Sequence, residues 1–84
     1  MPATRVSGLL LSEMKPGQRG VIASVQADCP HRRRLEQMGL VLGTEVELLR
    51  IAPLGDPIEI SLRGYRLCLR RTEASALHVR LLES

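Results

Sequence analysis

Apolar and polar residues alternate most regularly in the second half of the chain, and this alternation predicts short β-strands. Residues 58–62 carry isoleucine or leucine at every second position, with polar residues between them, the pattern of a strand with one buried face. The same period recurs over residues 65–69 and 77–81. Because Gly64 separates the first two of these segments, we expect them to form a tight hairpin.

Two further strands are predicted in the first half of the chain. Residues 20–25 contain several β-branched side chains and follow a turn-forming Pro-Gly pair. Residues 45–51 alternate at first, and then their apolar positions shift to Leu49 and Ile51. Such a change of phase indicates a β-bulge or a bend within the strand.

Helical turns are expected between these strands. Ser12 and Thr72 each precede a glutamate and are predicted to cap single turns, because a hydroxyl at that position accepts a backbone hydrogen bond. A longer helical segment is predicted after residue 25. Pro30 is expected as its first residue, with Asp28 or Cys29 as the cap, and Gly39 as its left-handed end.

Five short strands with one or two short helices describe a mainly β fold, a small β-barrel. The 84 residues leave room for one domain, which we take as residues 1–84. Phe and Trp are absent and Tyr65 is the single aromatic residue. The core must therefore be aliphatic, and the helix after residue 30 must be pinned to the sheet by Leu35, Met38 and Leu40.

The charge pattern disfavours a nucleic-acid interface. The formal net charge is +3, and all basic residues except Lys15 are arginines, whose planar groups suit carboxylates as well as phosphates. Tyr65 alone cannot provide the stacking platforms that single-stranded nucleic acids require. A nucleic-acid-binding barrel therefore remains only a second alternative.

Residues 1–8 are polar and contain no apolar segment, so we expect no secretory leader. The two cysteines, Cys29 and Cys68, are then expected as reduced thiols in the cytosol. No apolar run is long enough to span a bilayer. An enzyme is not expected either, because no nucleophile–base set or phosphate-binding glycine loop occurs.

The segment CPHRRRLEQMGL, residues 29–40, raises two hypotheses. The first is a transition-metal site, for Zn or Fe, made by Asp28, Cys29 and His31. Structural metal sites gather three or four such ligands at defined spacing, and here no second cluster is present. The alternative is that Asp28 or Cys29 caps the helix while His31 is exposed.

The second hypothesis is a partner-binding surface made by the three consecutive arginines, Arg32, Arg33 and Arg34. Basic groups in the first turn of a helix oppose its dipole by about 0.3–1 kcal/mol each. Their presence therefore indicates either contact with a partner or compensation by Glu36, Glu45 or Glu47. Further candidates for partner contact are Leu54 and Asp56, in a turn flanked by two prolines, and Tyr65. The alternative for this turn is a structural role, in which Gly55 supplies a positive φ and the Asp56 carboxylate accepts hydrogen bonds from nearby backbone N–H groups.

Four stretches, taken in order, closely resemble the ferrous iron transport protein A (FeoA) family. They are LSEMKPGQRG (11–20), RRRLEQMGL (32–40), GTEVEL (43–48) and APLGDPIEISLRGYRLCLRRTEA (52–74), and the resemblance runs from about Leu9 to Leu82. It implies an SH3-like β-barrel in the bacterial cytosol and no catalytic activity. It also implies an accessory role to FeoB, the membrane ferrous-iron permease with a cytosolic GTP-binding domain.

The resemblance and the residues together predict a docking module that FeoB recruits to the inner face of the membrane. A peptide groove lined by several aromatics cannot form here, so contacts must use aliphatic groups, arginines or an exposed strand edge. Edge pairing would also permit a homo-oligomer. The alternative is a metal-dependent, self-associating or regulatory module that uses Cys29 and His31.

Overall fold

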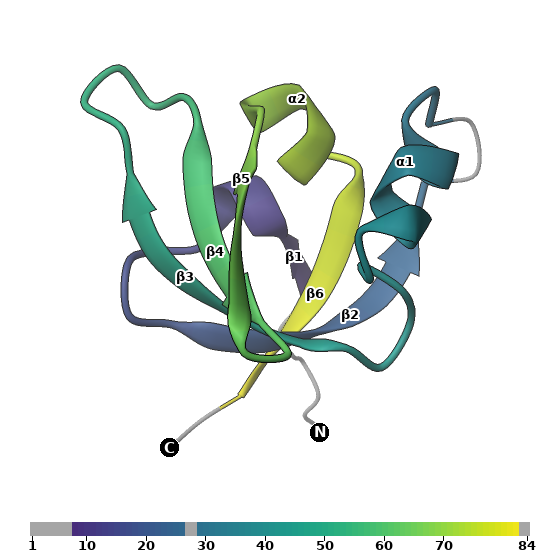
Figure 1. Cartoon of the computed structure of the whole chain (residues 1–84). Helices are drawn as coiled ribbons and strands as arrows, with labels where there is room; N and C mark the ends of the chain where they lie inside the picture. The colour runs from purple at the N-terminus through teal and green to yellow at the C-terminus, as the bar shows by residue number, and fades with distance from the viewer. Residues whose placement is uncertain (1–7, 27–28, 83–84) are drawn as a thin grey trace.

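Six antiparallel strands form one curved sheet in the computed structural model, which describes residues 8–26 and 29–82 (Figure 1). The elements in chain order are β1 (Gly8–Leu10), the 3-10 turn η2 (Leu11–Glu13), β2 (Arg19–Val25), α1 (Arg32–Gln37), β3 (Glu45–Ile51), β4 (Ile58–Leu62), β5 (Tyr65–Leu69), α2 (Arg71–Ala74) and β6 (Leu77–Leu82). The mainly β, SH3-like fold predicted from the sequence is confirmed.

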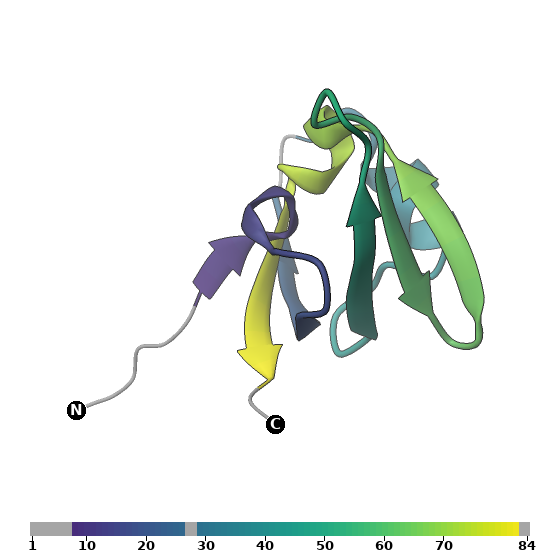
Figure 2. The same cartoon turned by 90° about the vertical axis from the view of Figure 1, so that its left-hand side faces the viewer.

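The strands are ordered β1-β6-β2-β3-β4-β5, so β1 and β5 are the two edges of the sheet. Figure 2 shows these two edges on opposite sides of the molecule. The three-residue strand β1 was not predicted, because Leu9 and Leu10 lead directly into a helical turn and show no alternation. The expectation of five strands was therefore one too few.

The strand registers agree with the sequence pattern. Leu62 pairs with Tyr65 across a two-residue turn in which both central residues, Arg63 and Gly64, have positive φ angles of 49° and 85°. These values define a type I′ hairpin turn, whose twist matches that of the flanking strands. The predicted bulge in β3 is confirmed by a register shift between Leu48 and Arg50.

The core is aliphatic, as expected. Its fully buried members include Leu11, Ile22, Leu48, Ile60, Leu69 and Leu77. Leu35 and Leu40 are also fully buried, and Met38 packs against the same cluster. These three residues hold the six-residue helix α1 on the sheet, since so short a helix is not stable alone.

The predicted caps at Ser12 and Thr72 are wrong. η2 starts at Leu11 and α2 at Arg71, so the caps are Leu10 and Arg70, two residues before the predicted ones. In each turn the glutamate at the third position reaches back to a free backbone N–H. Leu10 donates to Glu13 at 2.7 Å, and Arg70 donates to Glu73 at 2.9 Å.

The start of α1 also differs from the prediction. The helix begins at Arg32, and Pro30 lies in the turn before it. Cys29 Sγ accepts the N–H of His31 at 3.3 Å, so the thiol supports this turn and does not cap the helix. Asp28, the other proposed cap, lies outside the described residues. Gly39, with φ 94°, ends the helix as predicted.

No helix within residues 8–26 and 29–82 has the length and apolar character needed to cross a membrane.

Candidate docking surface

Helix α2 links two segments that are distant in the sequence. On one side, Arg71 N–H donates to Asp56 Oδ1 at 3.0 Å in the β3–β4 loop. On the other side, Arg34 Nη1 of α1 lies 2.5 Å from Glu73 Oε2. Figure 1 shows α2 between this loop and α1, at one end of the sheet. We call the β3–β4 loop (52–57), α2 and α1 the loop–helix rim.

Leu54 is the most exposed apolar residue of this rim, with 94% of its surface accessible. The loop that carries it is internally ordered. Gly55 N–H donates to the Ala52 carbonyl at 2.7 Å, and Ala52 N–H donates to the Pro57 carbonyl at 3.1 Å. An apolar side chain that an ordered loop holds in water is a candidate contact point, because little entropy remains to be lost on binding.

The three arginines of α1 have different surroundings. Arg32 forms an exposed pair with Glu36 at 3.3 Å, as the sequence predicted for this spacing. Arg34 pairs with Glu73 of α2. Arg33 is exposed and has no ion pair with any residue that the structure describes. Arg33 is therefore the one of the three whose charge is fully available to a partner.

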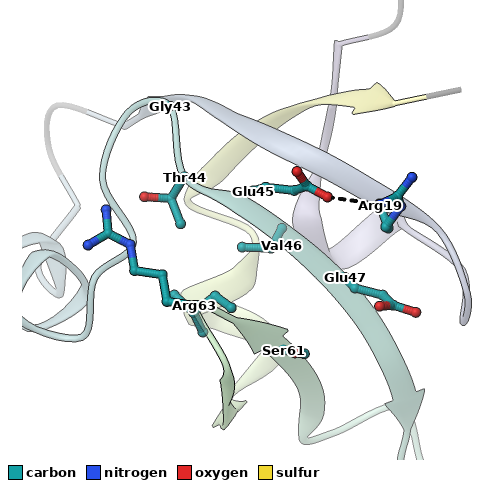
Figure 3. A pocket seen from close by; sticks show the side chains of 9 residues that line it. Arg19, Gly43, Thr44, Glu45, Val46, Glu47, Ser61 and Arg63 are labelled. Carbon is teal, nitrogen blue, oxygen red and sulfur yellow. Dashed lines mark hydrogen bonds and ion pairs between the residues drawn. The ribbon is translucent and has the colours of Figure 1, made fainter.

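Glu45 and Glu47 were considered as counter-charges for these arginines, and this expectation is wrong. Glu45 pairs with Arg19 of β2 at 3.1 Å, in a hollow away from α1 (Figure 3). Glu47 and Arg63 also line this open hollow of about 420 Å³. The Arg63 side chain points toward the loop at Gly43 and Thr44 (Figure 3). Because charges of both signs line the hollow, it does not define a site for an ion of one sign.

Glu73 is a residue of the rim whose role sequence reasoning missed. Its side chain is 1% exposed, and its two oxygens accept hydrogen bonds from Arg34 and from the Arg70 backbone. A buried carboxylate needs such partners to offset its lost hydration. The available signal was the glutamate three residues after Arg70, a spacing typical of a reciprocal cap.

The free positive charge of the rim comes from Arg33 and Arg71. Both are exposed, and neither forms a side-chain ion pair in the described part of the chain. Arg71 lies beside the loop of Leu54, since a Cβ added to Gly55 would be 3.1 Å from its Nη1. The rim therefore combines one apolar contact with guanidinium groups, which suits a protein surface bearing carboxylates.

Tyr65 does not belong to this rim. It begins β5 at the turn end of the β4–β5 hairpin, whereas Leu54 precedes the opposite end of β4. Its hydroxyl donates to the Met38 carbonyl, and the residue is 43% exposed. Asp56 lies in the rim, but its carboxylate already accepts a bond from α2. Among the predicted contact residues, Arg34, Leu54 and Asp56 thus gather around α2, and Tyr65 lies apart.

The proposed metal ligands are only partly brought together. Cys29 and His31 line a shallow hollow of about 320 Å³ with residues of α2 and its C-terminal side. Among the residues described, no three His, Cys, Asp or Glu side chains form a group able to hold a metal ion. Asp28 lies outside the described residues. The described donor set therefore supplies two ligands, fewer than a resident zinc or iron ion requires.

These features define a small SH3-like β-barrel with a basic, apolar-tipped rim. The FeoA domain family matches residues 9–81, and the chain belongs to the FeoA family. The family's domain is associated with ferrous iron transport.

Three similar proteins support this assignment. An Fe(2+) transport protein A/Fe(2+) transporter FeoB fusion protein of Porphyromonas gingivalis is 35% identical over 74 residues, 88% of this chain but 9% of that protein. A FeoA-like protein from Clostridium acetobutylicum has 35% identity and a TM-score of 0.87, covering 95% of this chain and 93% of the other. FeoA of Stenotrophomonas maltophilia, described as a prokaryotic SH3 domain protein in complex with zinc, has 33% identity and a TM-score of 0.73, covering 84% and 88%.

Proposed function

We propose that this chain is a non-catalytic docking module of bacterial ferrous-iron uptake. It binds the cytosolic part of an FeoB-type, GTP-dependent permease and biases the conformation or the nucleotide cycle of that permease. The fusion protein of Porphyromonas gingivalis supports the pairing, because it joins a segment similar to this chain to an FeoB transporter. This chain spans about 9% of the length of that relative, so the transport activity belongs to the partner.

The observation that carries the proposal is the exposure of Leu54 on an ordered loop that lies beside Arg71. A leucine of this exposure contributes almost nothing to the core, and burial against a partner would stabilise a complex by about 1.5–3 kcal/mol. Arg33 and Arg71 on the same rim add long-range attraction to an acidic surface. Leucine provides the affinity, and the arginines guide the approach.

The test is co-purification with a permease of the FeoB type from the same cell. Leu54→Ser is expected to reduce recovery of the complex about tenfold or more, the effect of losing 1.4 kcal/mol. Leu42→Ser is the matched control, because Leu42 is 67% exposed but lies in the loop before β3, outside the rim. Normal recovery with Leu54→Ser, or equal loss with Leu42→Ser, would reject the rim as the docking surface.

The contribution of charge is tested separately with Arg33→Glu. Arg34 is unsuitable because its reversal would also disturb the buried Glu73. We expect Arg33→Glu to slow association and to weaken the dependence of binding on salt, with little change in stability. Unchanged association kinetics at low salt would contradict an electrostatic role for the rim.

A metal-dependent module is the second candidate, favoured by the adjacent Cys29 and His31 and by the zinc complex of the Stenotrophomonas maltophilia relative. Equilibrium dialysis with Zn²⁺, comparing the wild type with Cys29→Ala/His31→Ala, tests whether these donors hold metal. If a chelator abolishes co-purification with the permease and the double variant reproduces that loss, the metal-dependent module is supported and metal-independent docking is rejected.

A further inference from the structure

The edge strand β5 leaves two residues with unpaired backbone groups. In a two-residue hairpin the pair next to the turn is hydrogen-bonded, and bonded and non-bonded pairs then alternate. Leu62 faces Tyr65 next to the turn, so the backbone groups of Tyr65 point toward β4. The N–H and C=O groups of Arg66 and Cys68 therefore point away from β4. No other described strand lies on that side of β5.

This open edge has a defined length. At one end, the turn residues Arg63 and Gly64 carry positive φ angles and cannot continue a ladder. At the other end, the Arg70 N–H already donates to Glu73 Oε1. Between these limits Arg66 and Cys68 offer four backbone groups, two donors and two acceptors. An added antiparallel strand of four or five residues, about the length of β5 itself, would satisfy all four groups.

The charges beside this edge indicate which kind of strand can bind there. Arg66 is exposed in the middle of β5, and Arg70 is exposed directly after its last residue. Glu59 of β4 is shared between Arg66 at 3.9 Å and Arg50 at 3.8 Å, so it does not fully neutralise Arg66. If a second copy of the chain paired with this edge, its Arg66 would lie close to Arg66 of the first copy. Like charges on neighbouring strands are destabilising. Edge pairing between copies, which the sequence suggested, is therefore disfavoured.

The two faces of β5 also differ. Arg66 and Cys68 are exposed on the outer face, whereas Leu67 is half-buried beside the core on the inner face. A strand added to this edge would place alternate side chains beside Arg66 and beside Leu67. The partner side chains beside Arg66 should be acidic, and those beside Leu67 should be apolar. Arginines that repel identical edges protect against aggregation, and the same arginines attract an acidic strand.

We propose that the β5 edge binds an extended, acidic segment of a partner protein in which carboxylate and apolar side chains alternate, by adding it as a seventh strand. This edge runs from the Arg63–Gly64 turn to Arg70, where the chain enters α2 and the loop–helix rim, and it does not include Leu54. The inference does not depend on the proposed permease.

The test uses the whole chain and two synthetic peptides, followed by NMR and amide hydrogen exchange. One peptide alternates glutamate with valine, and its matched control has lysine in place of every glutamate. With a saturating amount of the glutamate peptide, the exchange of the Arg66 and Cys68 amides should slow on the order of tenfold. The lysine peptide should leave both amides unchanged. Equal effects of the two peptides, or protection confined to β1, would overturn the proposal.

Two pairs of variants separate the backbone contribution from the charge contribution. Cys68→Pro removes one outward N–H without removing a bond to β4, and Cys68→Ser keeps that N–H. Arg66→Glu reverses the charge beside the edge, and Arg80→Glu does the same at an exposed position of β6. We expect Cys68→Pro and Arg66→Glu to weaken peptide binding about tenfold, while their controls bind normally.

Arg66→Glu keeps the proposal testable if Cys68→Pro fails to fold. Undiminished binding by Arg66→Glu would reject the acidic edge partner. Amide protection at Arg66 and Cys68 that grows with protein concentration, without any peptide, would show pairing between copies and would likewise reject it.

Discussion

The guanidinium of Arg34 on α1 lies 2.5 Å from the carboxylate of Glu73 on α2, and that carboxylate is almost completely buried. The two helices contain six and four residues, so neither has enough internal hydrogen bonds to persist alone. Their ion pair connects them across 39 residues of sequence. It also determines which arginine of α1 is structural and which remains available to a partner.

Replacement of Arg34 should therefore destabilise the fold. Arg34→Ala leaves the Glu73 carboxylate buried with only the Arg70 backbone bond. We expect a loss of about 1–3 kcal/mol in the free energy of unfolding, reduced from the value for a fully buried pair because the Arg34 side chain is 57% exposed. Urea denaturation measures this loss. Arg33→Ala is the matched control and should change stability by less than about 0.5 kcal/mol.

The origin of that loss can be checked with a double-mutant cycle. Glu73→Gln removes the charge and retains a carbonyl oxygen, so Arg34→Ala should cost less in that background. A coupling energy of about 0.5–3 kcal/mol is expected for residues in direct contact. Additive effects of the two substitutions would show that the charge of Glu73 does not contribute to the stabilisation by Arg34.

Two glycines with similar backbone conformations should respond differently to alanine. Gly39 and Gly43 have φ angles of 94° and 87°, which any other residue adopts only with strain. A Cβ on Gly39 would also lie 3.0 Å from the Tyr65 hydroxyl, whereas a Cβ on Gly43 would meet nothing within 4 Å. We expect Gly43→Ala to cost about 1–2 kcal/mol and Gly39→Ala to cost more, as measured by chemical denaturation.

The Tyr65 hydroxyl provides a control for this comparison. Tyr65→Phe alone should cost about 0.5–1.5 kcal/mol, because the hydroxyl no longer donates to the Met38 carbonyl. In the Tyr65→Phe background the close contact of an added Cβ is gone, so Gly39→Ala and Gly43→Ala should become similar. If the difference between the glycines persists, the contact with Tyr65 is not its cause.

The Asp56 carboxylate should stabilise α2 through one oxygen. Asp56→Ala leaves the Arg71 N–H at the start of the helix without its acceptor, which should cost about 0.5–2 kcal/mol. Asp56→Asn keeps an acceptor oxygen in the same place and should restore most of that loss. Thermal unfolding followed by circular dichroism measures both. Equal destabilisation by the two substitutions would assign the effect to the loop and not to the hydrogen bond.

Several elements were predictable because their signals are local. The period of two over residues 58–62 and 65–69, with Gly64 between them, determines the hairpin, since a shift by one residue would expose every buried side chain. The phase change before Ile51 marked the bulge in β3. Gly39 marked the end of α1, because few other residues adopt its backbone conformation.

Other features had no local signal. The strand β1 has three residues, and among the described strands it pairs with β6, about 70 residues later in the sequence. The sequence does not distinguish Arg32, Arg33 and Arg34. In the structure Arg32 pairs within its helix, Arg34 pairs with α2, and Arg33 has no ion pair with a described residue. Tyr65 and Asp56 appeared as candidate contact residues, but the Tyr65 hydroxyl bonds to Met38 just after α1, and the Asp56 carboxylate bonds to α2.

The amino-acid sequence by itself determined the mainly β architecture, most of the strands, the aliphatic core and the family. These properties follow from side-chain periodicity, turn chemistry and motif order, all of which act over a few residues. Only the tertiary structure decided that Glu73 is buried, that Arg34 is its partner, and that β5 is an edge strand of the sheet formed by the described residues. The reason is physical: burial, ion pairing and strand order depend on contacts between segments that are far apart in the sequence. A local pattern of residues does not determine those contacts.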